Sequence, residues 1–420
     1  MIMKKNFYLL VLSFLFVGMI TKTTHATGTI PIDTTHGRYY SQIFSSVTIT
    51  SGVVYGSNTD YTGSPTTLTM DIYQPVGDTV SQRPLIVFAH GGSFISGSKT
   101  DQDVSSLCTT FAKMGYVTAS INYRLGFYPF DSIHAVPAVI RGVQDMKAAI
   151  RFFRKDFATS NTYKIQPNYV FAGGSSAGAF MALHLAYLTQ TSEVPSYVNI
   201  SSMGGLEGTS GNPGYSDNVN GVVNLCGAIG DTSWVKSGAI PFVSMQGDSD
   251  HTVPYGTALI IVAGNPIMRV SGCHSLNIRA NNVGVPNPFY TFYNADHVPY
   301  AGTSASQIAY MDTTVNFVKI FLRPLLVQPS VTSVPELTNN NDVSVYPNPT
   351  QNNLFIKFSD NNMNQHLVQL FDVTGKQLMS SQFNGSFYSI NRGNIASGVY
   401  FLRITDTKNA KSYIKKVVFY

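Results

Sequence analysis

The fold of this chain is decided by residues 169–188, which read YVFAGGSSAGAFMALHLAYL. The apolar run Tyr169–Ala172 predicts a short strand, and the apolar residues of Ala179–Leu188 predict a helix close behind it. Between the two lies Gly174-Ser175-Ser176-Ala177-Gly178, which fits the pattern G-x-S-x-G. At a strand-to-helix turn this pattern is typical of a nucleophilic serine held on a very tight bend, and it marks Ser176.

A phosphate or dinucleotide loop is the alternative for the same glycines. Gly173-x-Ser175-x-x-Gly178 differs by one residue from G-x-G-x-x-G. A dinucleotide site would need an acid about 20 residues further on, and the only acid in that region is Glu193. The context therefore favours a nucleophilic serine.

A second glycine-rich loop lies upstream, at His90-Gly91-Gly92-Ser93-Phe94, directly after the apolar run Leu85–Ala89. Backbone amides that converge on a developing oxyanion need residues with little side-chain bulk. We expect Gly92 and Ser93 to donate there, with Gly91 as a further candidate. Ala177 would add its N–H from the start of the helix. His90 is expected to be structural, because the loop places it behind the oxyanion hole.

A nucleophilic serine needs a base, and the base needs an orienting acid. On this architecture the acid follows the serine in the chain and the histidine follows the acid. Asp248 and Asp250 both follow the predicted strand Pro241–Met245, and Asp250 is favoured because it stands next to the turn into a predicted helix. Asp248 can instead bond its own backbone in the turn. His297 fills the position of the base, in the loop after the predicted strand Pro288–Tyr293.

The surrounding pattern indicates an α/β fold with three layers and a mainly parallel sheet, because strands and helices alternate. Thr189–Asn220 interrupts the alternation and is expected to form a loop or small lid bordering the active site. The remaining expected strands are Leu68–Tyr73, Tyr116–Tyr123 and Gly221–Leu225, and the remaining expected helices are Val104–Lys113, Val136–Asp156 and Ser304–Leu322.

Both ends of the chain differ from this α/β region. Residues 1–26 have a basic start, the apolar run Phe7–Ile20 and a small-residue cleavage site, which predicts a signal peptide; a membrane anchor is the alternative. The α/β domain is expected over 27–326 and a Pro/Ser/Thr/Asn-rich linker over 327–342. Short strand-like runs over 343–420 predict a small all-β sandwich domain. These runs are Val343–Tyr346, Asn353–Phe358, Leu367–Asp372, Val399–Ile404 and Ser412–Phe419.

Composition excludes other classes of protein. The 420 residues are 44% hydrophobic and only 12% charged, which rules out a highly charged disordered chain. The chain has 27 Lys and Arg and 22 Asp and Glu, and three of the lysines lie in residues 1–26. Without residues 1–26, 24 basic and 22 acidic residues remain, which gives a net charge of +2. That balance predicts no nucleic-acid partner. The sequence has no P-loop, no HExxH and no cysteine pair at zinc spacing, so neither a cofactor nor a metal is expected. A disulfide between Cys226 and Cys273 is left open.

Residues 66–323 resemble the α/β-hydrolase superfamily, specifically esterases and lipases with an HGG oxyanion loop. The matching motifs are His90–Phe94, Asn122-Tyr123-Arg124-Leu125, Gly174–Gly178, Gly247-x-x-Asp250-x-x-Val253-Pro254 and Asp296-His297. The resemblance implies a catalytic triad of Ser176, Asp250 and His297 and the cleavage of carboxylic esters without a cofactor. Ser93 stands where the common form of the loop has a further glycine.

Residues 343–420 resemble the type A sorting domain of the type IX secretion system of Bacteroidota. The motifs are Val345-Tyr346-Pro347-Asn348-Pro349, Val373-x-Gly375, Ser397–Phe401 and Lys415-Lys416-Val417. The resemblance implies a partner in the secretion machinery and a route through the periplasm to the cell surface or the medium. A carbohydrate-binding or spacer domain is the alternative.

The favoured function is therefore that of a secreted serine carboxylesterase. Its substrate would be a small ester, an acylated polysaccharide or a polyester. An exopeptidase or amidase on the same fold and a non-catalytic surface adhesion protein are the two alternatives.

Overall fold

The computed structural model describes residues 32–326, 342–359, 364–373, 375–407 and 412–420. The chain divides into two compact units, Met1–Gln328 and Pro329–Tyr420. The expected signal peptide and residues 327–341 of the expected linker lie outside the described residues.

The first unit is built on a mostly parallel sheet whose strand order is β1-β2-β4-β3-β5-β6-β8-β11. β1 pairs antiparallel with β2, and β2 pairs antiparallel with β4, while the pairs from β4 through β11 are parallel. Every residue of β3, at the middle of the sheet, is buried, as expected of a parallel strand covered on both faces. The bounds are β1 Val47–Thr59, β2 Pro65–Pro75, β3 Arg83–Ala89, β4 Val117–Ile121, β5 Ile165–Ser175, β6 Gly221–Leu225, β8 Phe242–Gly247 and β11 Phe289–Phe292.

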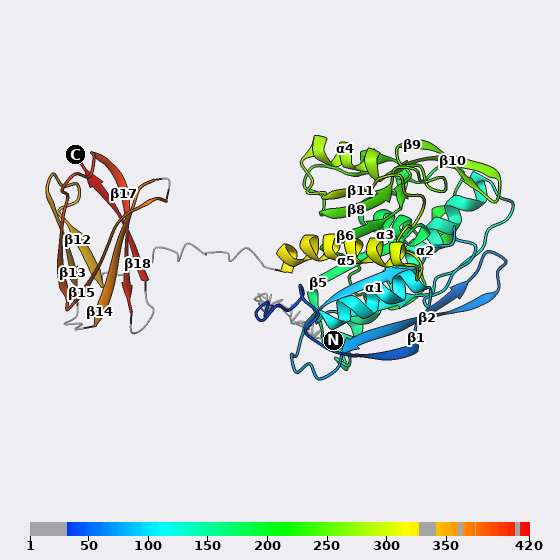
Figure 1. The fold of residues 1–420 in the computed structure, drawn as a ribbon, viewed down its shortest axis with the longest axis horizontal. Helices are drawn as coiled ribbons and strands as arrows, with labels where there is room; N and C mark the ends of the chain where they lie inside the picture. Colours follow the sequence, from blue (N-terminus) through cyan, green and yellow to red (C-terminus); the bar gives the residue numbers. More distant parts are fainter. Residues whose placement is uncertain (1–31, 327–341, 360–363, 374, 408–411) are drawn as a thin grey trace, which may run out of the picture. The chain divides into compact units, whose positions relative to one another are not determined.

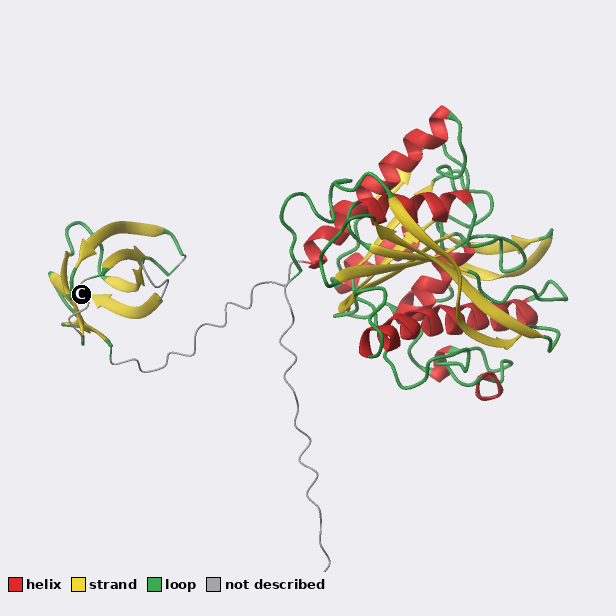
Figure 2. Cartoon of the chain, turned by 90° about the horizontal axis from the view of Figure 1, so that it is seen from below, coloured by secondary structure: helices red, strands yellow, loops and turns green. Residues whose placement is uncertain are grey.

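Helices cover both faces of this sheet and make three layers (Figures 1 and 2). One apolar core joins the sheet to α1 (Gln102–Lys113) and α5 (Ala305–Leu326). A second core joins the other face to α2 (Ser132–Ala158), α3 (Ala177–Tyr187) and α4 (Cys273–Val283). The predicted three-layer α/β architecture is therefore confirmed.

A small sheet departs from the expected pattern. The region after β8 was expected to continue directly into a helix, but it first forms a hairpin of β9 (Thr257–Val262) and β10 (Asn265–Gly272), and α4 begins only at Cys273. The turn residues Ala263 and Gly264 both have positive φ, the backbone of a two-residue hairpin turn. β10 also pairs with β7 (Ala228–Ile229). The helix expected immediately after the Asp250 loop is therefore wrong.

The segment 189–220 contains two short 3₁₀ turns, Thr191–Glu193 and Ile200–Met203, and packs against α2. The side-chain amide of Gln144 on α2 donates to the carbonyls of Met203 and Gly205, at 2.8 and 2.7 Å. Lys147, one turn further along α2, pairs with Glu207 at 2.6 Å. This segment is therefore held on the outside of α2 by polar contacts along its length.

The second unit is an all-β sandwich with one three-stranded and one four-stranded sheet. Their orders are β12-β13-β16 and β15-β14-β17-β18. Apolar side chains from both sheets form its core, among them Leu354, Ile356, Val368 and Leu402. The bounds are β12 Val343–Tyr346, β13 Asn353–Phe358, β14 Gln365–Phe371, β15 Gln377–Asn384, β16 Phe387–Asn391, β17 Gly398–Asp406 and β18 Ser412–Phe419. β15 and β16 were not predicted.

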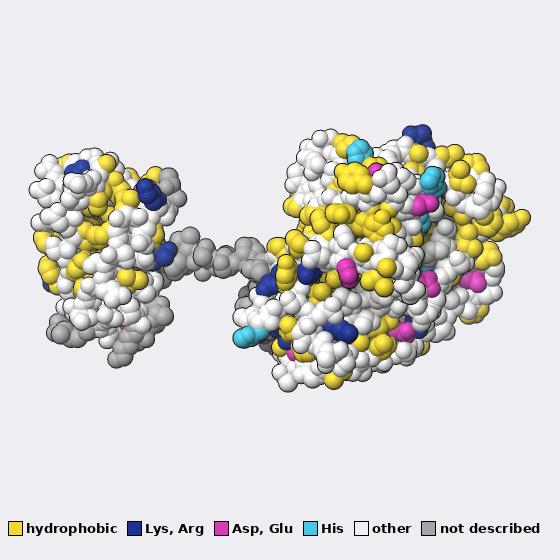
Figure 3. Space-filling view, viewed as in Figure 1, with side chains coloured by type: hydrophobic (Ala, Val, Ile, Leu, Met, Phe, Trp, Pro, Cys, Tyr) yellow, Lys and Arg dark blue, Asp and Glu magenta, His cyan; other side chains and the backbone are white. Residues whose placement is uncertain are grey.

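Few charged side chains show on the face of the described residues drawn in Figure 3, in keeping with a charged content of 12%. Two further findings concern the cysteines and the helices. Cys108, Cys226 and Cys273 are all buried free thiols, so the Cys226–Cys273 bridge is not formed. Within the described part of the chain, no helix has both the length and the apolar character needed to cross a membrane.

Candidate active site

Ser176 lies between β5 and α3 in a strained backbone conformation, with φ 54° and ψ −118°. Its N–H donates to the carbonyl of Leu225 on the neighbouring β6 at 2.8 Å, which holds the bend in place. A Cβ on Gly174 would lie 2.3 Å from the carbonyl carbon of Gly178, and one on Gly178 would lie 2.0 Å from the carbonyl oxygen of Ala89. Only glycine fits at these two positions, because real Cβ contacts are never so short. Backbone strain is therefore present at the residue predicted to be the nucleophile.

The three residues expected to form a triad come together at the carboxyl end of the sheet. His297 Nε2 is 2.9 Å from Ser176 Oγ, and His297 Nδ1 is 2.8 Å from Asp250 Oδ2. Ser176 follows β5, Asp250 follows β8 and His297 follows β11, so three separate parallel strands supply them. Because Nδ1 faces a carboxylate, it is the nitrogen that carries the proton, and Nε2 is left to accept from the serine hydroxyl.

The Asp250 carboxylate is fully buried and held by backbone and side-chain donors. Its Oδ1 accepts the N–H groups of Thr252 and Val253 at 2.9 and 2.8 Å. Its Oδ2 accepts the side-chain amide of Gln246 at 3.0 Å as well as His297. These donors satisfy the buried charge and fix its orientation toward the imidazole.

Gln246 is a positioning residue that sequence reasoning missed. Besides its bond to Asp250, its amide donates to the carbonyl of Val253 at 2.8 Å. Its oxygen accepts the N–H of Cys273 at 3.0 Å. The side chain therefore ties the acid loop to the start of α4. Nothing in the local sequence distinguishes this glutamine, because its partners are brought to it only by the fold.

Asp248, the other candidate acid, does not reach His297. Its Oδ1 accepts the N–H of Asn294 at 2.7 Å, across to the loop after β11. Asp296 likewise turns toward backbone, where its Oδ1 accepts the N–H groups of His251 and His297, and these bonds lower the pKa of the Asp296 carboxyl. The structure therefore brings Asp250, and not Asp248, to the histidine.

The glycine-rich loop passes beside Ser176. A Cβ built on Gly91 would lie 3.2 Å from the Cβ of Ser176. Gly92, Ser93 and Phe94 have positive φ in succession, at 102°, 54° and 61°. This unusual backbone turns the chain sharply, and the Gly92 carbonyl accepts N–H groups from the next residues of the loop, Ile95 and Ser96.

Ser93 and Ala177 border the same hollow as Ser176, and Gly91 and Gly92 border a second hollow with it. The structure thus brings the four candidate oxyanion residues around the serine. Their role as donors to an oxyanion stays a prediction.

His90 holds the loop from behind, as expected. It is fully buried, its Nδ1 lies 2.7 Å from the Gly91 carbonyl, and its ring stacks on Tyr123 at 4.4 Å between centroids. Burial lowers the pKa of the His90 imidazole, so it stays neutral in this position. The Tyr123 hydroxyl donates to the carbonyls of His90 and Gly91, at 3.0 and 3.2 Å.

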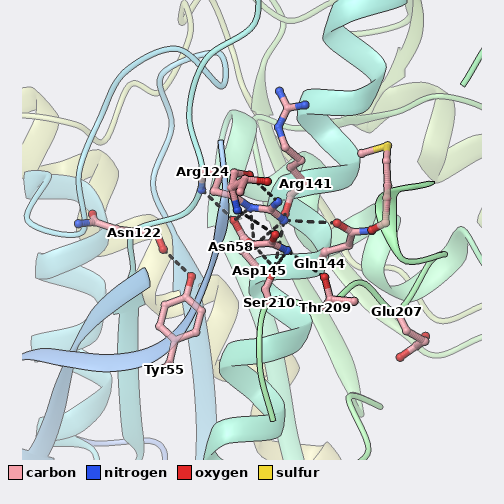
Figure 4. A network of polar contacts seen from close by, with 12 residues as sticks. Tyr55, Asn58, Asn122, Arg124, Arg141, Gln144, Asp145, Glu207, Thr209 and Ser210 are labelled. Atoms are coloured by element: carbon pink, nitrogen blue, oxygen red, sulfur yellow. Dashed lines mark hydrogen bonds and ion pairs between the residues drawn. The ribbon is translucent and has the colours of Figure 1, made fainter. Parts of the chain in front are cut away.

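Arg124, which follows Tyr123 in the chain, is the centre of a buried polar network (Figure 4). Arg124 Nη2 pairs with Asp145 on α2 at 2.8 Å, and its backbone N–H donates to the same carboxylate at 2.8 Å. Ser210, from the segment 189–220, donates to Asp145 at 2.6 Å. Arg124 Nη1 donates to the carbonyl of Thr59 at the end of β1. The network therefore links β1, α2 and the segment 189–220 beside Tyr123 in the chain.

Two hollows meet at Ser176. The first, which we call the apolar pocket, has a volume of about 70 Å³ and is bordered mainly by apolar side chains of α2, α3 and the β9–β10 hairpin. The second, the open cleft, has a volume of about 500 Å³ and is bordered by His297 and by polar residues at the start of α1, Asp101–Asp103. The segment 189–220 borders neither hollow, so the expectation that it borders the active site, as a loop or small lid, is wrong. This segment packs on α2 instead.

The donor set at the back of the triad does not favour a metal. Ligand atoms of Cys226, Asp250 and His297 lie within 4.8 Å of one another. Burial, with the nearby Asp250 charge, raises the pKa of the Cys226 thiol to about 12, so it remains a protonated and poor ligand. Asp250 and His297 are already bonded to each other.

Comparison with known proteins finds one family match in each unit. Residues 70–230 match the model of the BD-FAE family, and residues 344–420 match the model described as secretion system C-terminal sorting domain. Carboxylesterase 3B of Mus musculus is 36% identical over 121 residues, which cover 28% of this chain and 20% of that protein. An endo-acting ulvan lyase of Formosa agariphila is 37% identical over 78 residues, 18% of this chain and 14% of that protein. The chain thus spans a fifth or less of the length of these two relatives.

Among solved structures, esterase 2 of Thermogutta terrifontis phosphorylated by paraoxon aligns with 67% of this chain and 95% of its own, at 20% identity and a TM-score of 0.49. The two family matches agree with the eight-stranded, mostly parallel sheet of the first unit and the all-β second unit. The chain therefore carries an esterase-like domain of the α/β-hydrolase fold, followed by a type IX sorting domain.

Proposed function

We propose that this protein is a secreted serine hydrolase that cleaves carboxylic esters through an acyl-enzyme intermediate. The observation that carries the proposal is the continuous chain of two hydrogen bonds, from Ser176 Oγ to His297 Nε2 and from His297 Nδ1 to Asp250. An esterase-like domain that places these two hydrogen bonds at the end of its sheet has the groups needed for acyl transfer.

In the first half of the reaction, Ser176 Oγ attacks the acyl carbon and His297 Nε2 takes the hydroxyl proton. Asp250 keeps the imidazole in the tautomer that can accept this proton and stabilises the imidazolium. The amides of Gly92, Ser93 and Ala177, with Gly91 as a further donor, bind the oxyanion of the tetrahedral intermediate. His297 then gives its proton to the leaving alcohol as the bond between the acyl carbon and the alcohol oxygen breaks.

In the second half, a water molecule takes the place of the alcohol. His297 accepts a proton from the water as the water oxygen attacks the acyl carbon. The proton returns to Ser176 Oγ when the acid departs, so the enzyme is regenerated. Side chains and amides of this chain supply each step, and no cofactor enters the scheme.

The location of this activity follows from the second unit. The sorting domain implies that the protein is handed to the type IX machinery, and we propose a route through the periplasm to the cell surface or the medium. The ester substrate is then one met outside the cell.

The test compares matched substrates with the purified protein. We expect turnover of 4-nitrophenyl acetate, no comparable turnover of an aminoacyl 4-nitroanilide, and covalent labelling of Ser176 by a fluorophosphonate. Faster cleavage of the anilide would favour an exopeptidase or amidase. Absence of both turnover and labelling in folded protein would favour a non-catalytic surface protein.

A further inference from the structure

The apolar pocket at Ser176 is small and backs onto a much larger hollow. This neighbouring cavity has a volume of about 600 Å³ and lies among α2, α3, β10 and residues 192–195. The apolar pocket has about 70 Å³. Since a cavity of roughly 150 Å³ holds one benzene molecule, the apolar pocket has room for an acyl group of only a few carbons.

The two hollows share a wall. Val139 on α2, Phe180 on α3, and Met268 and Val270 on β10 border both of them. Phe180 and Met268 are the largest of the four side chains. They come from two different elements, α3 and β10, and each separates the apolar pocket from the neighbouring cavity, because each borders both.

Phe180 is buried between aromatic side chains. Its ring packs edge-on against Phe94 of the oxyanion loop, with 6.5 Å between centroids, and lies parallel to His184 at 6.3 Å. His184 Nδ1 is 2.7 Å from the Phe180 carbonyl, which ties the two residues one turn apart on α3. Met268 is only half-buried and sits on the hairpin. A long, unbranched thioether side chain there can fill the remaining gap without being locked by neighbours.

The neighbouring cavity could hold an alkyl chain. Its lining includes the apolar side chains of Leu188, Val194 and Trp234. Three charged side chains also border it: Lys236 and Glu193 pair with each other at 3.0 Å, and the Asp231 carboxylate accepts the N–H of Ser233 at 2.7 Å. An alkyl group entering from Ser176 would therefore pack against apolar side chains, while the Lys236–Glu193 pair stays bonded and the exposed Asp231 stays hydrated.

Resting on the proposed function, we propose that Phe180 and Met268 form a partition that limits this esterase to short acyl groups. Removing either side chain would join the two hollows and admit a longer acyl chain. Acyl specificity would then depend on two side chains that take no part in the chemistry.

The experiment compares the parent protein with Met268→Ala and Phe180→Ala. Ile261→Ala is the matched control, because Ile261 lies on the same hairpin and borders the apolar pocket but not the neighbouring cavity. The readout is kcat/KM for acetyl, butyryl, octanoyl and dodecanoyl 4-nitrophenyl esters. We expect the ratio of octanoyl to acetyl to rise at least about tenfold in Met268→Ala, which is about 1.4 kcal/mol of transition-state stabilisation. Ile261→Ala should keep the parent's ratio.

A second readout shows whether a long alkyl group enters the neighbouring cavity. Trp234 is the only tryptophan of the protein and borders the neighbouring cavity. Each variant is labelled at Ser176 with an ethyl or a dodecyl fluorophosphonate. We expect the dodecyl label to change Trp234 emission in Met268→Ala and Phe180→Ala, but not in the parent or in Ile261→Ala. If Phe180→Ala does not fold, Met268→Ala, at a less buried position, carries the test alone.

The outcomes are distinguishable. Labelling by the ethyl probe in all variants, with no gain for longer esters and no change in Trp234 emission, would overturn the partition while leaving the proposed function intact. Failure of the ethyl probe to label the folded parent would overturn the proposed function and this inference with it. Efficient dodecanoyl turnover by the parent would also contradict the partition.

Discussion

Ser176 and Ser175 are adjacent in the chain but have different surroundings. Ser176 Oγ bonds to His297, whereas Ser175 Oγ lies 2.9 Å from the buried hydroxyl of Tyr300. Ser176→Ala should reduce ester turnover by a factor on the order of 10⁴–10⁶, because no other group can form the acyl-enzyme. The measurement is kcat on 4-nitrophenyl acetate together with thermal unfolding, which should be unchanged.

Ser175→Ala is the control for this prediction. Leaving the Tyr300 hydroxyl short of a partner should cost about 1–3 kcal/mol of stability while most activity remains. The reverse pattern, with activity lost only in Ser175→Ala, would show that the register of the nucleophile is wrong.

The two neighbouring acids differ in the same way. Asp250→Asn should lower kcat by about 10⁴, because an amide at this position favours the wrong tautomer of His297. Asp248→Asn should have a small effect, since an asparagine oxygen can still accept the N–H of Asn294. Steady-state kinetics of both variants checks the assignment, and equal losses would contradict it.

At the scale of elements, β5 and α3 can pack closely against β3 only because Gly174 and Gly178 have no side chain. Gly178→Ala would place a Cβ 2.0 Å from the Ala89 carbonyl oxygen, which is backbone and cannot move aside cheaply. We expect a loss of about 1–3 kcal/mol of stability, with slow fluorophosphonate labelling because α3 and Ser176 shift together. Thermal unfolding and labelling rates measure the two effects.

Gly256→Ala is the matched substitution, because its Cβ would meet only the Ser275 hydroxyl at 4.0 Å. It should leave labelling unchanged. A similar slowing in both variants would show that the tight contact at Gly178 does not control the position of Ser176.

Helix α3 also carries a buried histidine that affects stability. Burial lowers the pKa of His184 from 6.5 to about 4. Between these pH values the unfolded chain binds a proton that the folded chain does not, so stability falls as the pH falls from 6.5 toward 4. The loss should total up to about 3 kcal/mol once the pH is below both values.

Denaturant unfolding across this pH window measures the effect. His184→Gln should show a weaker dependence on pH, although His90, whose pKa burial also lowers, still contributes in the same direction. His251→Gln is the control, because the His251 side chain is 82% exposed. An unchanged slope in His184→Gln would show that this residue is not buried in its neutral form.

At the scale of the whole molecule, the first unit contains every residue of the site. The last of them is His297, and α5 ends at Leu326. A chain ending after Gln328, the limit of the first unit, should therefore fold and hydrolyse soluble esters at close to the parent's rate. Assays of the purified truncation measure this. A folded truncation with little activity would show that the second unit shapes the active site.

The same truncation tests the sorting domain. In a host with type IX secretion, we expect the shortened protein to accumulate in the periplasm, because it lacks the unit that matches a secretion sorting domain. Activity in periplasm and medium, compared with the full chain, is the readout. Normal release of the truncation into the medium would contradict the sorting role.

The sequence by itself determined the strands from β2 onward that form the main sheet, though not β1, the helices α1, α2, α3 and α5, and the three residues that meet at the end of the sheet. Each of these features leaves a signal in a short stretch of sequence. A strand followed by G-x-S-x-G needs two glycines whose missing Cβ atoms allow the bend, and apolar periodicity marks the elements on either side. Acid and base could be found because strands that run parallel in one sheet end at the same edge. The two family motifs then separated the esterase-like unit from the sorting unit.

Only the tertiary structure decided which partners lie around these residues. The region of the β9–β10 hairpin was wrongly expected to be helical. Local pattern was the only guide to it, whereas pairing between strands selects its backbone. Gln246 and Arg124 look like ordinary polar residues until folding brings Asp250, Asp145 and their other partners to them. The wall between the two hollows joins Phe180 to Met268, 88 positions later in the chain. Contacts at such separations depend on how helix and hairpin pack together, which periodicity does not specify.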